Sequence, residues 1–504
     1  MGLKSFFTLF FISLSWVSCS DCFAKLKVAG IFQTEMVLQK ASKVPVWGES
    51  DPDQIVKIDF INKTYKTKAD KCGKWKLKMD LHNYGGPYKM KVYTDSNTIS
   101  FEDIMVGEVW LCGGQSNMQW PVSKSNNAKE EIRDASHPNI RICSIDKKFL
   151  DYPANDLSTK WNRCTAETIE NFSAVGYFFG RDLQKDINVP VGLIMCAWGG
   201  STIEAWTSRQ TLNSLPEFKK TMAAYSEINS TEIMKKNKSI SSSALRRKLE
   251  ILGHKKPFGA FNGMINPIIP YSIKGVIWYQ GEANASRAYQ YRSLFPALIK
   301  DWRNRWEQGD FPFLFVQLAG FKEQSAEPND SEWAELREAQ TMALKLPNTG
   351  MALAIDIGEL QSIHPKNKQE VGRRLALIAL EKVYGKDVKS SGPMFSKMEI
   401  DKNNINLYFD FAYKGLKSKG IKLRGFAIAN KDKKFKWAEA EIKGKKVVVH
   451  SDEIKNPIAV RYDWDGYPTG NLYNSEDLPA CPFRTDDFQL TTFDRYTNIF
   501  SLKE

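Results

Sequence analysis

The feature that most constrains this chain is the alternation of apolar strand patterns with amphipathic helix patterns between residues 106 and 383. The strand-like runs are 108–112, 140–145, 192–197, 275–279, 313–318 and 351–355, and the helix-like stretches are 173–187, 288–306, 332–344 and 368–383. Strands and helices in alternation favour a parallel sheet with helices on both faces. The sequence therefore predicts an α/β core.

Segments with a strand pattern but no helix pattern flank this core on both sides. Period-two alternation between turns predicts a small N-terminal β-sandwich over residues 25–104. Residues 391–504 again show short strand patterns, which form a second β unit or complete the first. With the core at residues 105–390, the 504 residues divide into three units, in line with roughly 150 residues per domain.

Residues 1–24 have the pattern of a secretory signal. Lys4 precedes an apolar run at 6–17, and small and polar residues lead to Ala24. A membrane-spanning helix needs about twenty apolar residues, so we expect an exported protein, periplasmic or extracellular, with no transmembrane span. Cys19 offers an alternative as a lipid anchor, although Trp16 fits that signal poorly.

Six cysteines remain after the signal, and they allow fifteen full pairings. We expect a disulfide between Cys143 and Cys164, with buried free thiols as the alternative for Cys112 and Cys196. No cluster of His and Cys has the spacing of a zinc site, and the chain has five His. We therefore expect no metal and no cofactor.

The net charge of +13 comes from single lysines scattered among acids rather than from a basic cluster. This distribution argues against nucleic-acid binding and indicates a lysine-rich solvated surface that helps to attract anionic ligands. The lysine-rich stretch 216–257 belongs to no expected strand. It is either an exposed helical hairpin or a lid over the site.

Polar and glycine residues follow four of the expected core strands. They are Ser116, the Gly199–Gly200 pair, Asn284, and Asp356 followed by His364. Because ligands gather outside the carboxyl ends of parallel strands, we expect these residues to converge.

The converging residue types are those of acyl transfer. A serine hydroxyl needs an imidazole to take its proton, and the oxyanion needs backbone N–H or amide donors. His364 is the one His that directly follows an apolar strand of the core and precedes a helix. Met118 stands where the G-x-S-x-G elbow has its second glycine, which argues against a common α/β-hydrolase. The alternative for Ser116 is a helix N-cap.

Several motifs together resemble the sialate O-acetylesterases of the SGNH hydrolase superfamily. The motifs are Gly114-Gln115-Ser116-Asn117-Met118, Trp198-Gly199-Gly200 with Ile203-Glu204-Ala205-Trp206, Trp278-Tyr279-Gln280-Gly281-Glu282 with Asn284, and Ile363-His364-Pro365-Lys366-Asn367. The resemblance covers nearly the whole mature chain and implies an SGNH-like (flavodoxin-like) parallel sheet.

The resemblance also implies roles for individual residues. Ser116 would be the nucleophile and His364 the general base. The oxyanion hole would consist of the Ser116 N–H, a glycine N–H from Gly200 (Gly199 as the alternative) and the Asn284 amide. The expected substrate-binding residues are Gln115, Glu282 and Arg337, the last as a cation for an anionic sugar.

One departure concerns the acid that orients the histidine. The family pattern has Asp two residues before His, whereas Ser362 stands there in this chain. Asp356 or Glu359 would supply the carboxylate, or a backbone carbonyl would orient a Ser–His dyad. Loss of the acid from a triad can reduce turnover about 10⁴-fold.

The function implied by this resemblance is hydrolysis of O-acetyl esters on carbohydrate, with sialic acid as the sugar. An acetylxylan or other polysaccharide acetyl esterase would use the same residues and is the first alternative. A carbohydrate-binding protein with impaired catalysis is the second, because Ser362 replaces the acid and β units flank the core.

Overall fold

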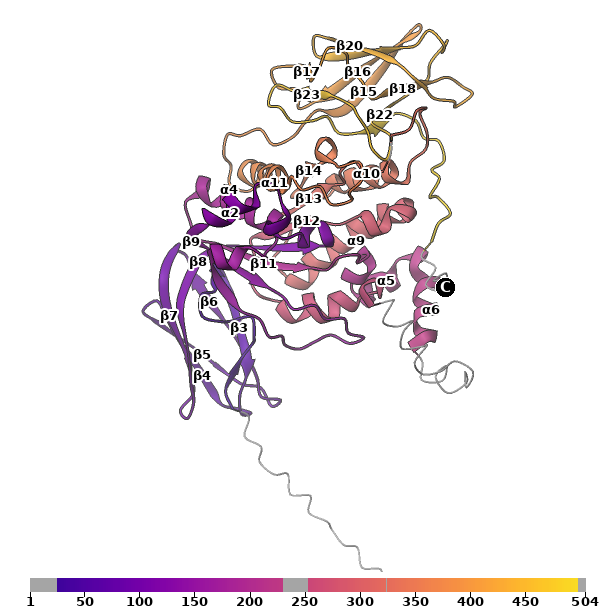
Figure 1. Cartoon of the computed structure of the whole chain (residues 1–504). Coiled ribbons are helices and arrows are strands. Elements are labelled where there is room, and N and C mark those ends of the chain that lie inside the picture. Colours follow the sequence, from indigo (N-terminus) through magenta and orange to yellow (C-terminus); the bar gives the residue numbers. More distant parts are fainter. Residues whose placement is uncertain (1–24, 230–252, 323, 497–504) are drawn as a thin grey trace, which may run out of the picture.

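The computed structural model describes residues 25–229, 253–322 and 324–496 and shows a mixed α/β fold with a large mixed sheet and additional β sheets (Figure 1). The expected signal segment at 1–24 lies outside the described residues. So does most of the expected lid, because 230–252 is not described.

The core of the large sheet has the strand order β10-β9-β11-β8-β12-β13-β14. All neighbours are parallel except β10, which is antiparallel to β9. The bounds are β8 (Thr98–Gly114), β9 (Ser136–Ser144), β10 (Trp161–Thr165), β11 (Val191–Ala197), β12 (Gly275–Tyr279), β13 (Phe313–Gln317) and β14 (Thr349–Leu353). The six core strands expected from the sequence are all present, five of them within a few residues of their predicted limits, whereas β8 begins ten residues before the expected 108–112.

Helices cover both faces of this sheet, as predicted. The four helices expected from the sequence are α4 (Ala174–Ile187), α9 (Ala288–Trp306), α10 (Glu332–Met342) and α11 (Lys368–Lys382). Successive residues of a strand face opposite sides, and Cys112 of β8 lies against α4 whereas Gly113 lies against Trp302 of α9. The other α-helices are α1 (Ser116–Gln119), α2 (Ala128–Arg133), α3 (Ala166–Ile169), α5 (Arg209–Ser214) and α6 (Lys219–Asn229).

The N-terminal residues form two β layers. One is the sheet β1-β3-β6, with β1 (Lys27–Val28), β3 (Ala41–Glu49) and β6 (Lys74–Leu81). The other is an extension of the large sheet, with β2 (Val37–Gln39), β4 (Ile55–Phe60), β5 (Lys63–Lys68) and β7 (Gly85–Tyr93). The alternation of exposed and buried residues in β6 is the period-two pattern on which the expectation of a sandwich rests.

Strand β8 is shared by the N-terminal sandwich and the α/β core. Its first half pairs with β7 and β2, and its second half pairs with β11 and β12. Every residue from Ile104 to Gly114 is buried. The expected boundary at 104/105 therefore falls inside one unbroken strand, and a single hydrophobic core extends from the sandwich into the α/β unit.

The C-terminal β strands form a separate unit at the opposite end of the molecule from the N-terminal sandwich (Figure 1). They are β15 (Met394–Asp401), β16 (Asn404–Asp410), β17 (Leu416–Ser418), β18 (Phe426–Ala429), β19 (Lys436–Trp437), β20 (Glu439–Lys443), β21 (Lys446–His450), β22 (Ala459–Tyr462), β23 (Leu472–Asn474) and β24 (Phe483–Arg484). They enclose their own hydrophobic core. The tail is thus a second β unit, and it does not complete the first.

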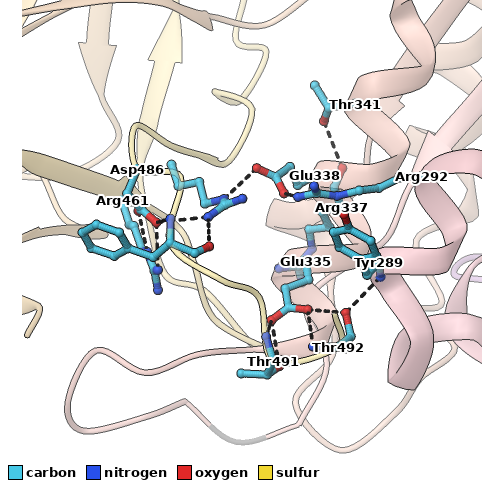
Figure 2. A network of polar contacts seen from close by, with 12 residues as sticks. Tyr289, Arg292, Glu335, Arg337, Glu338, Thr341, Arg461, Asp486, Thr491 and Thr492 are labelled. Atoms are coloured by element: carbon cyan, nitrogen blue, oxygen red, sulfur yellow. Dashed lines mark hydrogen bonds and ion pairs between the residues drawn. The ribbon is translucent and has the colours of Figure 1, made fainter. Parts of the chain in front are cut away.

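After β24 the chain returns to the α/β core and is bound there by polar contacts (Figure 2). The backbone N–H and hydroxyl of both Thr491 and Thr492 donate to the Glu335 carboxylate on α10. Arg484 bonds Glu338 on the same helix at 2.8 Å. These contacts fix the C-terminal unit to the outer face of α10.

The expected disulfide between Cys143 and Cys164 is wrong. Both residues lie on the antiparallel pair β9–β10, but Cys143 is opposite Trp161 whereas Cys164 is opposite His137, six residues along β9. A disulfide needs Cα atoms less than about 7 Å apart, and residues along a strand rise about 3.4 Å each. Both are buried free thiols, as are Cys112 and Cys196.

In the described part of the chain, no helix has the length and apolar content needed to cross a bilayer.

The packing of β8 where it passes from the sandwich into the α/β core can be tested by substitution of Gly107. A Cβ atom at Gly107 would lie 2.2 Å from the carbonyl oxygen of Pro190, where real Cβ atoms are not found, whereas a Cβ at Gly253 would have no neighbour within 4 Å among the described residues. We expect Gly107→Ala to reduce the free energy of unfolding by about 1–3 kcal/mol and to lower the Tm, because rigid backbone has to move. Gly253→Ala should leave the Tm near its wild-type value. Equal Tm values for the two variants in thermal unfolding would contradict this packing.

Candidate functional site

The turn after β8 fixes the position of Ser116. Gly114 has φ 138°, and a Cβ there would lie 2.1 Å from the Tyr279 carbonyl oxygen. The Gln115 N–H donates to the same oxygen at 3.0 Å, which ties the turn to β12. Ser116 is the first residue of α1, and the N-cap is Gln115, so the N-cap alternative for Ser116 is wrong.

The structure brings Ser116 and His364 together. The Ser116 Oγ lies 2.8 Å from the His364 Nε2, although the residues are 248 positions apart in the sequence. The Trp120 indole stacks on the imidazole with ring centroids 4.9 Å apart and planes 20° apart. A serine and a histidine in this contact can act as nucleophile and general base.

The backbone around His364 is held by the residue that replaces the family acid. The Ser362 Oγ accepts from the His364 N–H at 3.1 Å, and its hydroxyl also lies 3.2 Å from the His364 carbonyl oxygen. Ser362 thus holds the turn through the backbone of His364, and no hydrogen bond joins it to the ring in the described part of the chain.

The expected orienting carboxylate at Asp356 is engaged elsewhere. Arg374 binds its two oxygens at 2.6 and 2.8 Å, and the Tyr473 hydroxyl donates to it at 3.1 Å. Burial acts to raise the pKa of Asp356, but Arg374 holds it below its usual value. The assignment of Asp356 as the acid is therefore corrected to a structural ion pair.

The alternative acid, Glu359, accepts from the Lys366 N–H at 2.7 Å. Among the described residues, no Asp or Glu bonds to the His364 ring. The described geometry is that of a Ser–His dyad.

The glycine pair expected to supply an oxyanion donor lies beside Ser116. A Cβ on Gly199 would lie 3.3 Å from the Ser116 Cβ, so the glycine pair is close to the nucleophile. The Gly199 N–H donates to Gln119 at 3.0 Å. Gly200 has φ 74°, and its N–H bonds to no acceptor in the described part of the chain. This difference favours Gly200 over Gly199 as the donor.

Asn284 is buried and rigidly held. Its Oδ1 accepts from the Ile203 N–H at 2.9 Å and from Gln280 at 2.8 Å, and one of its amide protons is donated to Glu204 at 2.9 Å. An amide nitrogen has two protons, so one remains for a ligand. Glu204 also pairs with Arg287 at 2.7 Å.

Gln115 and Glu282, expected to bind substrate, contact protein groups. The Gln115 Oε1 accepts from the Gly281 and Ala283 N–H groups at 3.4 and 3.3 Å. The Glu282 Oε1 accepts from Asn117 at 2.5 Å. Its Oε2 is buried and has no hydrogen-bond partner in the described part of the chain.

A buried polar network lies under the dyad. Asn117 donates to Glu282 and, at 2.9 Å, to the carbonyl oxygen of Ile363, and its own oxygen accepts from the Lys368 Nζ at 2.5 Å. Burial lowers the pKa of Lys368 to about 7 and raises that of Glu282. The network connects the turn after β8 directly to the residue before His364.

The His364 pKa is lowered from its ordinary value of 6.5. Burial is the largest cause, and the positive charges of Lys368 and Lys124 add to it. This lowering of the pKa favours the neutral imidazole, the form that can accept a proton.

Arg337 is not in this site, and its assignment to substrate binding is wrong. The side chain is fully buried on α10 and donates to the carbonyl oxygens of Leu318, Ala319, Asp465 and Gly466. Burial lowers its pKa to about 10. Arg337 joins the end of β13 to the C-terminal unit.

Three residues of the site have no role assigned from the sequence: Trp120, Lys368 and Glu204, the last of which lies in a quoted motif. Trp120 had no signal of its own. A lysine as the first residue of a helix, where the helix dipole disfavours a cation, was a usable signal for Lys368. Among the described residues, no group of His, Cys, Asp and Glu is arranged to hold a metal ion.

A family model and the curated relatives of this chain all describe acetylesterases that act on sialic acid. A family model described as a carbohydrate esterase, sialic acid-specific acetylesterase, matches residues 106–236 and 255–381. The chain is similar to the sialate O-acetylesterase of Mus musculus, with 32% identity over 91% of this chain and 94% of that protein. The sialate O-acetylesterase of Homo sapiens is 30% identical over 91% of this chain and 92% of its own.

Among solved structures, a carbohydrate acetylesterase from Xanthomonas citri is similar over nearly the whole fold. The TM-score is 0.82 and the identity 36%, with 92% of this chain and 100% of that chain covered.

The structural role of Arg337 can be tested by measuring the thermal stability of a variant. Arg337→Met removes a donor from four backbone carbonyls. Those of Leu318 and Asp465 lose the donor that they have in the described part of the chain, whereas those of Ala319 and Gly466 keep the Trp333 indole and the Phe321 N–H. We therefore expect the free energy of unfolding to fall by about 3 kcal/mol and the Tm to drop. Arg133→Met, at an exposed arginine of α2, is the control and should leave the Tm near its wild-type value. A stable Arg337→Met protein with weaker affinity for an anionic substrate would restore the substrate-binding assignment.

Proposed function

This chain belongs to the carbohydrate esterase family of sialic acid-specific acetylesterases, and on that premise we propose that Ser116 and His364 carry out its reaction. It is a carboxylic ester hydrolase that removes O-acetyl groups from carbohydrate. The observation that carries the assignment of residues is the 2.8 Å contact between the Ser116 Oγ and the His364 Nε2.

In the proposed first half-reaction, the Ser116 Oγ attacks the acetyl carbonyl carbon while the His364 Nε2 accepts the hydroxyl proton. The tetrahedral intermediate collapses as the protonated His364 donates that proton to the departing sugar oxygen. The products are the deacetylated sugar and an acetyl ester on Ser116.

In the second half-reaction, water takes the place of the sugar. His364 accepts a proton from the water, whose oxygen attacks the acetyl carbon. Collapse returns the proton to the Ser116 Oγ and releases acetate. The same imidazole serves as base and acid in both halves.

Three donors support the proposed oxyanion hole. Ser116 is the first residue of α1, so its N–H has no acceptor within that helix. The Gly200 N–H and the second Asn284 amide proton are the others. Loss of one such donor typically costs about 10²–10³ in rate.

Three contacts support a dyad that functions without a carboxylate. Trp120 stacks on one face of the ring, Ser362 fixes the backbone of His364, and Asn117 holds the preceding carbonyl. A main task of the acid in a triad is to hold the imidazole in orientation, and these contacts perform it by other means.

Sialic acid is the first candidate sugar. Lys124 is exposed, close enough to lower the His364 pKa, and 5.8 Å from the Trp120 ring, so it offers a cation for a sugar carboxylate. Acetylated xylan is the second candidate, because Arg337, the expected partner of a sialate carboxylate, is buried away from the site.

We also propose an SGNH-like core. With β8 as the first strand, the strands β8, β11, β12, β13 and β14 have the order 2-1-3-4-5, and the dyad lies where the order reverses. Export of the protein is proposed on the pattern of residues 1–24 alone.

Acetate release tests this function. Purified protein should release acetate from O-acetylated sialoglycan or from acetylated xylan, and the faster reaction identifies the substrate. Ser116→Ala should lower kcat at least about a thousandfold. Ser286→Ala, at an exposed serine near Asn284, is the matched control and should retain turnover. Retained glycan binding without any acetate release from wild type would favour the non-catalytic alternative.

The fall of kcat/KM at low pH tests the role of His364 as the general base. Because His364 has to be neutral and its pKa is lowered, kcat/KM should rise through a midpoint below pH 6.5. Lys124→Gln removes a positive charge that disfavours the imidazolium, so the His364 pKa and the midpoint should move up. Lys300→Gln, at an exposed lysine of α9, should not move the midpoint. A midpoint above 6.5 in the wild type would contradict the role of His364.

A further inference from the structure

A cavity distinct from the Ser116–His364 site lies where the C-terminal β unit meets the loop that joins β13 to α10. Its volume of about 500 Å³ is within the range of small-molecule sites, about 300–1,000 Å³. A second cavity of about 280 Å³ shares Gly425, Trp437 and Trp464 with the first. The two together form one groove, which we call the aromatic groove; its aromatic residues are Phe426, Phe435, Trp437, Trp464 and Phe488.

Trp437 is an exposed aromatic platform in this groove. The side chain is 41% exposed, yet the indole N–H donates to the Ala326 carbonyl oxygen at 2.7 Å. The strand pairing of Trp437 with Ala427 fixes its backbone. A large ring held at its edge, with much of its surface open to solvent, offers rigid apolar area at little entropic cost.

Trp464 forms the wall that both cavities share. The guanidinium groups of Arg461 and Arg484 lie 5.3 and 5.5 Å from its ring. Arg461 also bonds Asp330 and Asp486, so its charge is balanced (Figure 2 shows the Asp486 pair). Lys433 and Lys434 also line the first cavity, so the groove combines aromatic surface with hydrogen-bonding and cationic side chains.

The two sides of the groove are bound to each other. Ser325 bonds Asp465 at 3.1 Å, and Lys436 approaches Glu327 at 3.5 Å. The loop that carries Ser325 leaves the carboxyl end of β13, the sheet edge on which Ser116 lies. One side of the groove is therefore formed by a loop that begins at the sheet edge carrying Ser116.

We propose that the aromatic groove binds a sugar chain several units long and holds the glycan whose acetyl ester reaches Ser116. A pyranose ring presents an apolar C–H face and a rim of hydroxyls. The Trp437 ring matches the face, and polar groups such as Asn329, Asp330 and Gln489 match the hydroxyls. The choice of a carbohydrate rests on the proposed function.

Direct binding to the full-length Ser116→Ala protein tests this proposal. The probes are unacetylated xylo-oligosaccharides of increasing length and a sialylated oligosaccharide, and the method is isothermal titration calorimetry. We expect affinity to rise with chain length for one of the two series, which identifies the neutral or the anionic glycan. Adding Trp437→Ala should raise the Kd of the longest chain about tenfold, a loss of about 1.4 kcal/mol.

Two further variants separate binding from folding. Trp437→Phe keeps an aromatic platform and should restore part of the affinity, whereas Tyr152→Ala, at an exposed aromatic elsewhere, should leave the Kd unchanged. An unaltered Kd in Trp437→Ala, or no dependence on chain length, would overturn the proposal. Acetate release from a small acetyl ester by the wild type reports separately on the proposed function, so either proposal can fail alone.

Discussion

The constraint on which this structure depends is the unbroken strand β8. It pairs with the N-terminal sandwich through its first half and with the central parallel strands through its second half, so both units share one hydrophobic core. The same strand ends in the Gly113–Gly114 turn, where contact with the Tyr279 backbone permits no side chain at Gly114. The position of Ser116 is therefore set by the packing of the whole sheet rather than by a flexible loop, as a reactive group needs.

The chemistry of the site follows from burial around that fixed point. Burial lowers the pKa values of His364 and Lys368 and raises that of Glu282, and Asn117 joins Lys368 and Glu282 to the carbonyl before His364. A buried hydrogen-bonded network of this kind rigidifies its surroundings. Together with the Trp120 stack, it gives the imidazole a fixed place although no carboxylate among the described residues bonds to it.

The core strands and several site residues could be predicted from the sequence, because the end of a strand is visible in a short stretch of neighbouring residues. Periodicity located the core strands, and the residues after them supplied Ser116, Gly200, Asn284 and His364. The contacts that each side chain makes with residues distant in the sequence could not be predicted in this way. Arg337 has the pattern of any helix arginine, and only packing shows that it is fully buried against four carbonyls. Arg374, eighteen residues from Asp356, captures that carboxylate. The six-residue offset between Cys143 and Cys164 depends on strand register, which sequence spacing does not reveal.

The central claim is that Ser116 is the nucleophile and that His364 activates it without a carboxylate. Labelling with a fluorophosphonate, followed by mass spectrometry of the peptides, tests this most directly. The account predicts a single modified residue, Ser116, in the wild type, no label in Ser116→Ala and much slower labelling in His364→Ala, while Asp356→Asn labels at a rate close to wild type provided that it folds. Label on another serine, or equal labelling of wild type and His364→Ala, would contradict it.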